Sequence, residues 1–115
     1  MHYKTFRSFA VVILLAMSAP CLAATITVNS LDDDIDDDGD CTLREAIVAA
    51  NSNSSSGSEA GECAAGEAEP VVDEITFDGG AVGIISITSP LPDIGEPVFV
   101  NGPGADQLAI DGSGL

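Results

Sequence analysis

Apolar and polar positions alternate from Ala24 to Asn29, and this alternation predicts the first strand of the chain. Ile26 and Val28 fall on one face of that strand, while the threonines fall on the other. A period of two residues is typical of a strand with one buried face. We therefore expect a half-buried strand at the start of the folded part of the chain.

The apolar period changes to that of a helix between Leu43 and Ala50. Thr42 and Glu45 match the capping box, in which the hydroxyl and the carboxylate each accept a hydrogen bond from a backbone amide. Asn51 is the expected end of the helix. Four apolar residues recur at helical spacing and predict one apolar face: Leu43, Ala46, Ile47 and Ala50.

The segment from Ser52 to Pro70 consists mainly of Ser, Gly, Ala and Glu. It has almost no large apolar side chain, so it cannot bury enough surface to order itself. We expect a loop that is tied down at Cys63.

After Val71 the chain consists of brief runs typical of strands, each closed by Gly, Pro, Asp or Asn: Glu74–Phe77, Ile84–Thr88, Pro97–Val100 and Leu108–Ile110. Their spacing suits a sandwich, a barrel or a solenoid of stacked coils. The sharp corners at Ser89–Pro92 and Gly102–Gly104 favour coils. The sequence stops after Gly114 and Leu115 without a capping element, so we expect further coils to follow.

Residues 1–23 have the pattern of a secretory signal peptide. A basic start precedes an apolar run from Phe9 to Met17, and small residues follow. The run is shorter than the roughly 20 residues of a spanning helix. We expect cleavage after Ala23, or else after Ala24, and no membrane span in the mature chain. Three regions result: the signal peptide 1–23, an N-terminal region 24–70 with strand, acidic loop, helix and tethered loop, and the first coils 71–115.

Loss of the signal peptide removes every basic side chain except Arg44, while all 19 acidic side chains remain. Such a polyanion repels nucleic acid and anionic lipid, so nucleic acid is excluded as a partner. The mature part has no His or Lys either, which excludes base-activated nucleophiles, Schiff-base chemistry and histidine metal sites. Only carboxylate chemistry is left, and we expect no catalytic residues.

Cys41 and Cys63 are the two cysteines of the mature part. In an exported protein an even number of cysteines suggests a disulfide bond, and the alternative is two unpaired thiols. A bridge across this loop would stabilise the fold by about 3 kcal/mol.

The acidic run before the helix has three interpretations, of which the first is a calcium site. The run fits the EF-hand pattern, with a turn at Gly39 and with oxygen ligands from Asp34, Asp36, Asp38, Asp40 and Glu45. Two facts oppose it: the preceding residues predict a strand and not a helix, and Glu45 is needed by the capping box. The second interpretation is a solvated loop whose aspartates favour the positive end of the helix dipole, and the third is diffuse attraction of cations.

Two smaller groups of charged residues have a structural and a functional interpretation. Arg44 could bind an acidic sugar, but we expect it to pair with a nearby aspartate. Asp73, Glu74 and Asp78 could supply the carboxylate pair of a glycoside hydrolase. No aromatic platform for a sugar accompanies them, so we expect turn-forming or strand-capping roles.

The segment Asp38–Ile47, DGDCTLREAI, together with Ala49–Asn51, resembles the CSLREA-type N-terminal module of exported bacterial proteins. Thr42 replaces the usual serine and keeps the capping hydroxyl, and a second cysteine such as Cys63 fits the pattern of the family. The resemblance implies a right-handed parallel β-helix whose N-terminal end is covered by the strand and the helix. It implies no catalytic residues. Later segments are similar to the first coils that follow the module: Asp73–Phe77, Thr88–Pro92, Gly102–Leu108 and Ile110–Gly112.

We therefore expect a mainly β chain that starts a right-handed parallel β-helix, with an N-terminal strand and a short capping α-helix. The expected function is that of a secreted or cell-surface segment that caps the coils and has no catalysis of its own. One alternative is the N-terminal part of a polysaccharide-active β-helix enzyme, and another is a calcium-binding surface or adhesion module. Calcium is the one candidate cofactor, and extracellular polysaccharide or cell-surface components are the candidate partners.

Overall fold

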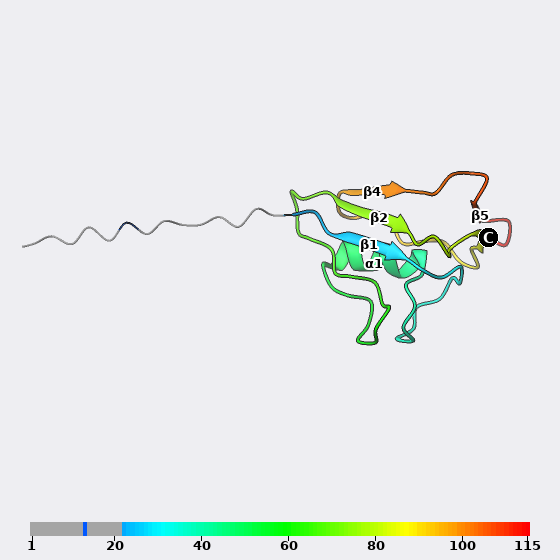
Figure 1. Ribbon diagram of the computed structural model, residues 1–115, viewed down its shortest axis with the longest axis horizontal. Coiled ribbons are helices and arrows are strands. Elements are labelled where there is room, and N and C mark those ends of the chain that lie inside the picture. The colour runs from blue at the N-terminus through cyan, green and yellow to red at the C-terminus, as the bar shows by residue number, and fades with distance from the viewer. Residues whose placement is uncertain (1–12, 14–21) are drawn as a thin grey trace, which may run out of the picture.

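The computed structural model describes residue 13 and residues 22–115, and these residues form five short strands and one helix (Figure 1). The mainly β composition predicted from the sequence is confirmed. The predicted signal peptide, residues 1–23, lies outside the described residues except for Ile13, Leu22 and Ala23. In chain order the elements are β1 (Thr25–Val28), α1 (Leu43–Ser52), β2 (Asp73–Phe77), β3 (Gly83–Ser86), β4 (Val98–Asn101) and β5 (Leu108–Asp111).

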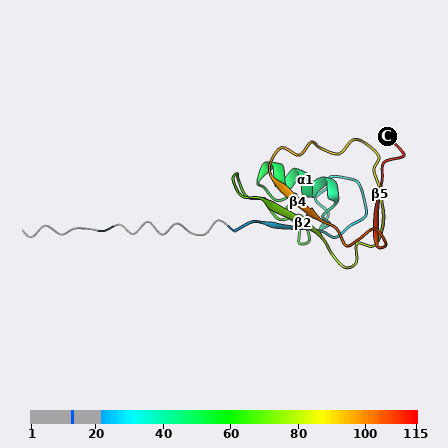
Figure 2. The same ribbon diagram turned by 90° about the horizontal axis from the view of Figure 1, so that it is seen from above.

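The strands form two sheets in which every pairing is parallel. One sheet has the order β1-β2-β4, and the other contains β3 and β5. Asp73 pairs with Val98 and Gly83 with Leu108, so both pairings join residues 25 apart (98 − 73 and 108 − 83). Figure 2 shows β5 running at a steep angle to β2 and β4, so the two sheets form different walls of the fold. The separate sheets do not establish a β-helix, and that finer prediction stays a prediction.

The predicted strands are found within one or two residues of their expected ends. In β1, Ile26 and Val28 are fully buried, while Thr25 and Thr27 are exposed, as the alternation predicts. The Thr27 and Thr76 hydroxyls lie 3.1 Å apart on the exposed face, where paired threonines add a hydrogen bond across the strands.

The helix α1 begins where the capping box places it but ends later than predicted. Thr42 is the N-cap, and both reciprocal hydrogen bonds with Glu45 are present. Asn51 is not the end, because Asn53 adopts the left-handed conformation (φ 53°, ψ 36°) that closes the helix. Instead, the Asn51 side chain bonds the loop before β4, at the carbonyl of Asp93 and the amide of Gly95.

The helix packs against β1 and β2, and its burial is wider than one apolar face. Of the residues from Leu43 to Ala50, Val48 alone is half-buried and the others are buried. The polar Arg44 and Glu45 are buried as well, and they find partners in the acidic loop before the helix and, for Arg44, in the segment after β3. Twelve residues form one core that joins both sheets and the helix: Ile26, Val28, Cys41, Leu43, Ala46, Ile47, Ala49, Ala50, Cys63, Ile75, Ile85 and Ile87.

Candidate functional site

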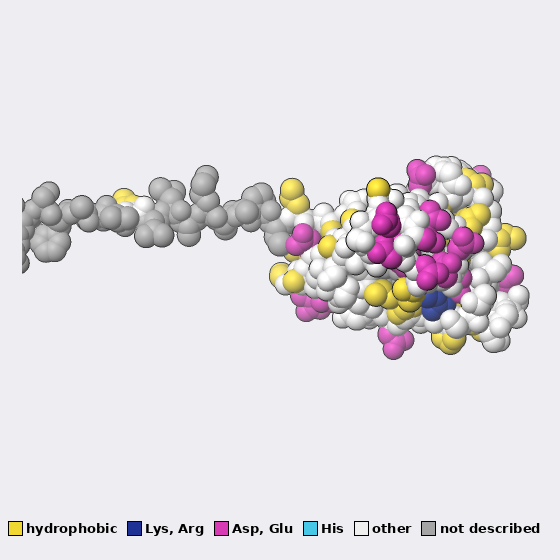
Figure 3. Space-filling view, turned by 90° about the horizontal axis from the view of Figure 1, so that it is seen from below, with side chains coloured by type: hydrophobic (Ala, Val, Ile, Leu, Met, Phe, Trp, Pro, Cys, Tyr) yellow, Lys and Arg dark blue, Asp and Glu magenta, His cyan; other side chains and the backbone are white. Residues whose placement is uncertain are grey.

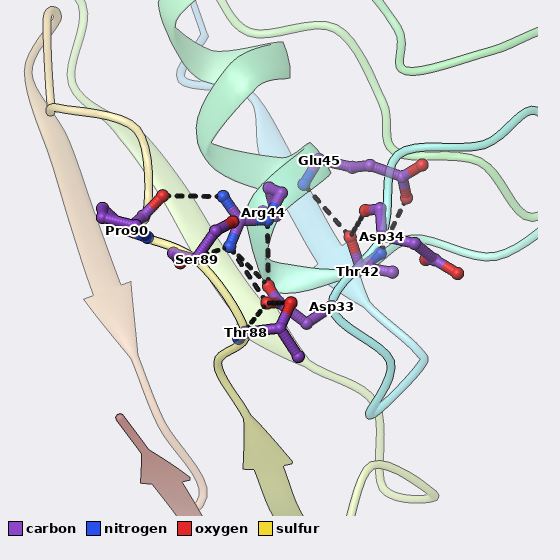
Figure 4. Close-up of polar contacts among 8 residues, drawn as sticks. All are labelled: Asp33, Asp34, Thr42, Arg44, Glu45, Thr88, Ser89 and Pro90. Carbon is purple, nitrogen blue, oxygen red and sulfur yellow. Dashed lines mark hydrogen bonds and ion pairs between the residues drawn. The ribbon is translucent and has the colours of Figure 1, made fainter. Parts of the chain in front are cut away.

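Arg44, in the first turn of α1, connects the helix to two other segments of the chain, one around Asp33 and one around Ser89 and Pro90 (Figure 4). Its Nε and Nη2 atoms donate to the two carboxylate oxygens of Asp33 at 2.9 and 3.0 Å. Its Nη1 and Nη2 atoms also donate to the carbonyls of Pro90 and Ser89, at 2.8 and 2.7 Å. The ion pair is nearly dry, with side chains 10% and 4% exposed. The prediction that Arg44 pairs with an aspartate is confirmed, and four of the five N–H donors of the guanidinium are used on Asp33, Ser89 and Pro90.

Asp33 is the acceptor at the centre of this network. Its Oδ2 atom also accepts from the Thr88 amide at 2.7 Å and from the Thr88 hydroxyl at 3.0 Å. Burial raises the pKa of Asp33, but the hydrogen bonds from Arg44 and Thr88 outweigh burial and leave that pKa below its ordinary value. The charged carboxylate therefore fixes the segment after β3 to the start of the helix.

A second network closes the N-terminus of α1. The two carboxylate oxygens of Glu45 accept from the amides of Asp36 and Thr42, each at 2.9 Å. The Thr42 hydroxyl accepts from the Glu45 amide at 3.2 Å and donates to the Asp34 carbonyl at 2.9 Å. Glu45 is only 1% exposed, so its charge is held by backbone amides at the positive end of the helix.

The predicted calcium ligands are not brought together as a ligand set. Glu45 uses both oxygens on amides, and Asp38 accepts from the amide of Asp40 at 3.0 Å. Burial and the charges of Asp32, Asp38 and Asp36 raise the pKa of Asp34. Within residues 13 and 22–115, no three His, Cys, Asp or Glu side chains form a group that could hold a metal. Calcium binding stays a prediction.

The acidic loop and the loop after α1 hold each other by reciprocal hydrogen bonds. Asp37 accepts from the amides of Ser58 and Glu59, at 2.9 and 3.0 Å, and from the Ser58 hydroxyl at 2.8 Å. In return, Glu62 accepts from the amides of Asp38 and Gly39, each at 2.9 Å. The loop from Ser52 to Pro70 is tied down at Cys63 as expected, and these carboxylate–amide bonds to the acidic loop hold it where apolar burial is missing.

The two loops also touch backbone to backbone. A Cβ atom on Gly61 would lie 2.0 Å from the carbonyl oxygen of Gly39, and both glycines have positive φ angles, of 106° and 90°. Only glycine fits this contact without strain. Figure 3 shows a group of acidic side chains on the drawn face of the molecule, beside the one basic side chain visible there.

The predicted disulfide bond between Cys41 and Cys63 is present, with an S–S distance of 1.92 Å. Cys41 precedes the N-cap of α1, and Cys63 lies in the loop after the helix. Both are at most 1% exposed. The bond thus ties the acidic loop to the loop after α1, and both cysteines form part of the core.

The three acids near β2 each have a structural partner. Asp73 is fully buried and accepts from the amides of Ala24 and Glu67. Glu74 accepts from the Asn101 side chain at 3.2 Å, and Asp78 accepts from the next amide at 2.9 Å. These contacts agree with the expected strand and turn roles.

Sequence reasoning missed three acceptors that hold the site together: Asp33, Asp37 and Glu62. Nothing in a run of seven aspartates between residues 32 and 40 distinguishes Asp33 from its neighbours. Glycines at the loop contact, such as Gly39 and Gly61, were the available signal that two backbones approach closely.

No protein-family model matches the chain, and no curated protein or solved structure matches it either. The resemblance to the CSLREA-type module therefore stays a prediction. No helix in the described part of the chain is long and apolar enough to cross a membrane. The described residues define a broad class: a mainly β domain with parallel strands, one capped helix and one disulfide bond.

We predict that the hydrogen bonds of the Asp37 and Glu62 carboxylates between the acidic loop and the loop after α1 stabilise the fold at neutral pH and not in acid. The pKa of Asp37 is lowered by the Ser58 hydroxyl and by the Glu59 and Ser58 amides, and that of Glu62 by the Ser56 hydroxyl and the Gly39 amide. A lowered folded pKa gives stability that is present above the unfolded pKa, near 3.8 and 4.5, and that is lost as the pH falls through the folded value.

The measurement is urea unfolding of the native protein and of the Asp37→Asn/Glu62→Gln variant between pH 6 and 3. The variant should be less stable at pH 6, and the difference should shrink below about pH 4.5. Asp40→Asn is the matched control, because no hydrogen bond to the exposed Asp40 carboxylate is found in the described residues, and it should follow the native protein at every pH. A difference that stays constant down to pH 3 would contradict the prediction.

Proposed function

We propose that residues 24–70 are a structural cap that closes one end of a parallel stack of strands in an exported protein. The observation that carries the proposal is the exposure of aliphatic side chains that occupy equivalent positions on neighbouring strands. Ile26 pairs with Ile75, and Ile75 pairs with Val100. Ile26 and Ile75 are 0% exposed, while Val100 is 48% exposed. The stack is closed at β1 and open at β4.

The second sheet is likewise closed at one strand and open at the other. Ile85 on β3 is 0% exposed, and its partner Ile110 on β5 is 52% exposed. A shallow apolar hollow of about 360 Å³ lies at this open end, lined by Phe77, Val100, Leu108, Ile110 and the 102–105 turn. At the closed end, α1 and the disulfide-linked loops cover the core. An uncovered strand edge invites pairing with other chains, so a cap protects against aggregation.

The shared offset of 25 residues supports the finer proposal that these strands begin a right-handed parallel β-helix. A third coil with the same offset would place aliphatic side chains on Val100 and Ile110 and would bury both. Such quasi-repeating stacks gain stability from each neighbouring coil. The proposal thus expects the open end to be covered in the complete protein.

The disulfide bond is compatible with an extracellular location, because such bonds persist in oxidising compartments. Export through the signal peptide, with a final place in the medium or on the cell surface, is part of the proposal. The enzyme and adhesion hypotheses stay predictions, since no contact among the described residues favours either.

The test uses the complete gene product with substitutions on one helix. Ala46 is fully buried, and Ala46→Asp should make the downstream coils insoluble or sensitive to protease. Val48→Asp, at the one half-buried position between Leu43 and Ala50, is the matched control and should leave solubility and protease resistance unchanged. Downstream coils that stay soluble and protected with Ala46→Asp would exclude a capping role.

A further inference from the structure

Asp73 is a buried carboxylate that has no cationic partner in the described residues. It is 0% exposed, and its contacts are backbone amides: Ala24 at 3.3 Å to Oδ1, and Glu67 at 3.1 and 3.0 Å to the two oxygens. Buried carboxylates are normally paired with a positive charge. Arg44, the only basic side chain after residue 23, is engaged with Asp33.

The nitrogen atom of Ala24 is held in place beside this carboxylate. On one side of Ala24, its carbonyl accepts from the Glu74 amide at 2.9 Å, and the next residue begins β1. On the other side, Ala23 is exposed and Leu22 is 75% exposed. Of residues 22–24, Ala24 is the first whose backbone bonds the sheet, and it is also the first residue after the expected cleavage site.

Cleavage at this bond would change the chemistry of the Ala24 nitrogen. A peptidase breaks the amide C–N bond between Ala23 and Ala24, and water supplies the oxygen of the new Ala23 carboxylate. The released amine binds a proton at neutral pH, since a free α-amine has a pKa of about 7.7–8.0. A neutral group with one N–H thus becomes an ammonium with three donors, at the position that lies 3.3 Å from Asp73 Oδ1.

We propose that removal of the signal peptide after Ala23 completes the fold, because the new α-ammonium of Ala24 pairs with the buried carboxylate of Asp73 and locks β1 to β2. The inference rests on cleavage at the expected bond and does not depend on the capping role. The residue that becomes the N-terminus after cleavage then has a structural role, so the mature protein is more stable than its precursor.

The composition of the mature chain makes this pairing measurable in isolation. His2, Tyr3 and Lys4 all leave with the signal peptide, and the two remaining cysteines are bridged. The α-amine is then the only group of residues 24–115 that titrates between about pH 6 and 10. Glu67, whose amide bonds Asp73, and Glu74, whose amide bonds the Ala24 carbonyl, are both acidic and favour the ammonium.

The first experiment compares residues 24–115 with a free amine and with an acetylated amine, which keeps an N–H but carries no charge. All five strands, the helix and the core lie within these residues. A paired ammonium has a raised folded pKa, so its stability is fully present below about pH 7.7 and is lost as the pH rises through the higher folded value. We expect the free-amine protein to have about a tenfold larger folding constant at pH 6.5, corresponding to a pKa rise of about one unit, and the advantage to vanish by about pH 10.

The second experiment measures the amine directly with an amine-reactive ester at pH 7.5. Because residues 24–115 contain no lysine, the ester can label the α-amine alone. Ala24 should react about ten times more slowly than Leu22 in a protein of residues 22–115, whose amine lies two residues before the position held beside Asp73. Asp73→Asn in the 24–115 protein should abolish the protection, and Asp40→Asn should not.

Equal stability of the free and acetylated proteins, together with equal labelling of Ala24 and Leu22, would overturn the proposal. Both measurements use the native sequence, so they decide the question even when Asp73→Asn fails to fold. N-terminal sequencing of the exported protein completes the test: Ala24 at the N-terminus supports the proposal, and any other first residue contradicts it.

Discussion

Replacing Arg44 with methionine should lower the free energy of unfolding by about 3–5 kcal/mol, because it leaves a buried carboxylate without its counter-charge. Asp33 is 4% exposed, and its remaining donors on Thr88 are neutral. The carbonyls of Ser89 and Pro90 would also lose their donors. Methionine keeps most of the apolar stem of arginine, so the loss reports on the charge and the hydrogen bonds rather than on packing.

The loss is large relative to the total stability of a small domain, which is typically about 5–15 kcal/mol. Urea unfolding followed by far-UV circular dichroism is the suitable measurement, because residues 24–115 contain neither Trp nor Tyr. Arg44→Lys should also be strongly destabilising, since an ammonium cannot supply the planar fork that reaches Asp33 and two carbonyls at once.

A double-mutant cycle distinguishes the stability contributed by the Arg44–Asp33 ion pair from a general destabilisation of the helix. Asp33→Asn should be destabilising alone, and the Arg44→Met/Asp33→Asn protein should be more stable than the sum of the two single losses implies. Asp40→Asn makes the same chemical change at an exposed position of the acidic loop and should stay within about 0.5 kcal/mol of the native protein. Additive effects of the two substitutions would show that the ion pair is not the source of the stability.

Removing the disulfide bond should cost about 3 kcal/mol or more. The bridge closes a loop with a sequence separation of 22, and restricting the unfolded chain in this way accounts for about 3 kcal/mol. Both sulfurs are buried in the core, so the Cys41→Ala/Cys63→Ala protein also loses packing contacts. The reciprocal bonds between the acidic loop and the loop after α1 should weaken with it, because Cys63 lies next to Glu62.

The comparison is urea unfolding of the native and double-alanine proteins, each with and without a reducing agent. Reduction should destabilise the native protein and leave the double-alanine protein unchanged. A native protein with the same urea midpoint in both conditions would mean that the bridge contributes nothing to stability. Arg44 binds the start of α1 to the segment after β3, and the disulfide bond links the residue before the N-cap to the loop after α1, so both tests probe how firmly the helix is held.

The local elements were predictable because the signals that specify them lie within a few residues of one another. The capping box joins Thr42 and Glu45 across one helical turn, and the alternation in β1 needs only Ile26 and Val28. The helix end was predicted too early, because Asn51 and Asn53 carry the same local signal and the tertiary contacts of Asn51 with Asp93 and Gly95 decide between them. Local patterns locate an element well and its boundary less well.

The partners of the charged residues could not be read from the sequence. Arg44 reaches Pro90 across 46 positions, and Asp33 reaches Thr88 across 55. Which aspartate of the acidic run meets the guanidinium depends on the path of the chain between them. The same holds for Asp73, whose burial beside Ala24 follows from the pairing of β1 with β2.

By itself, the sequence determined the acidic composition of residues 24–115, the start of the helix, the approximate strands and the two cysteines available for a bridge. These depend on residue type and on spacing within one turn or one strand. Only the tertiary structure decided the register in which the parallel strands pair, the bonds of the acidic loop and the loop after α1 to each other's amides, and the closure of one end of the strand stack while the other is open. Each of these is a long-range contact, and its energy exists only once separate segments have been brought together.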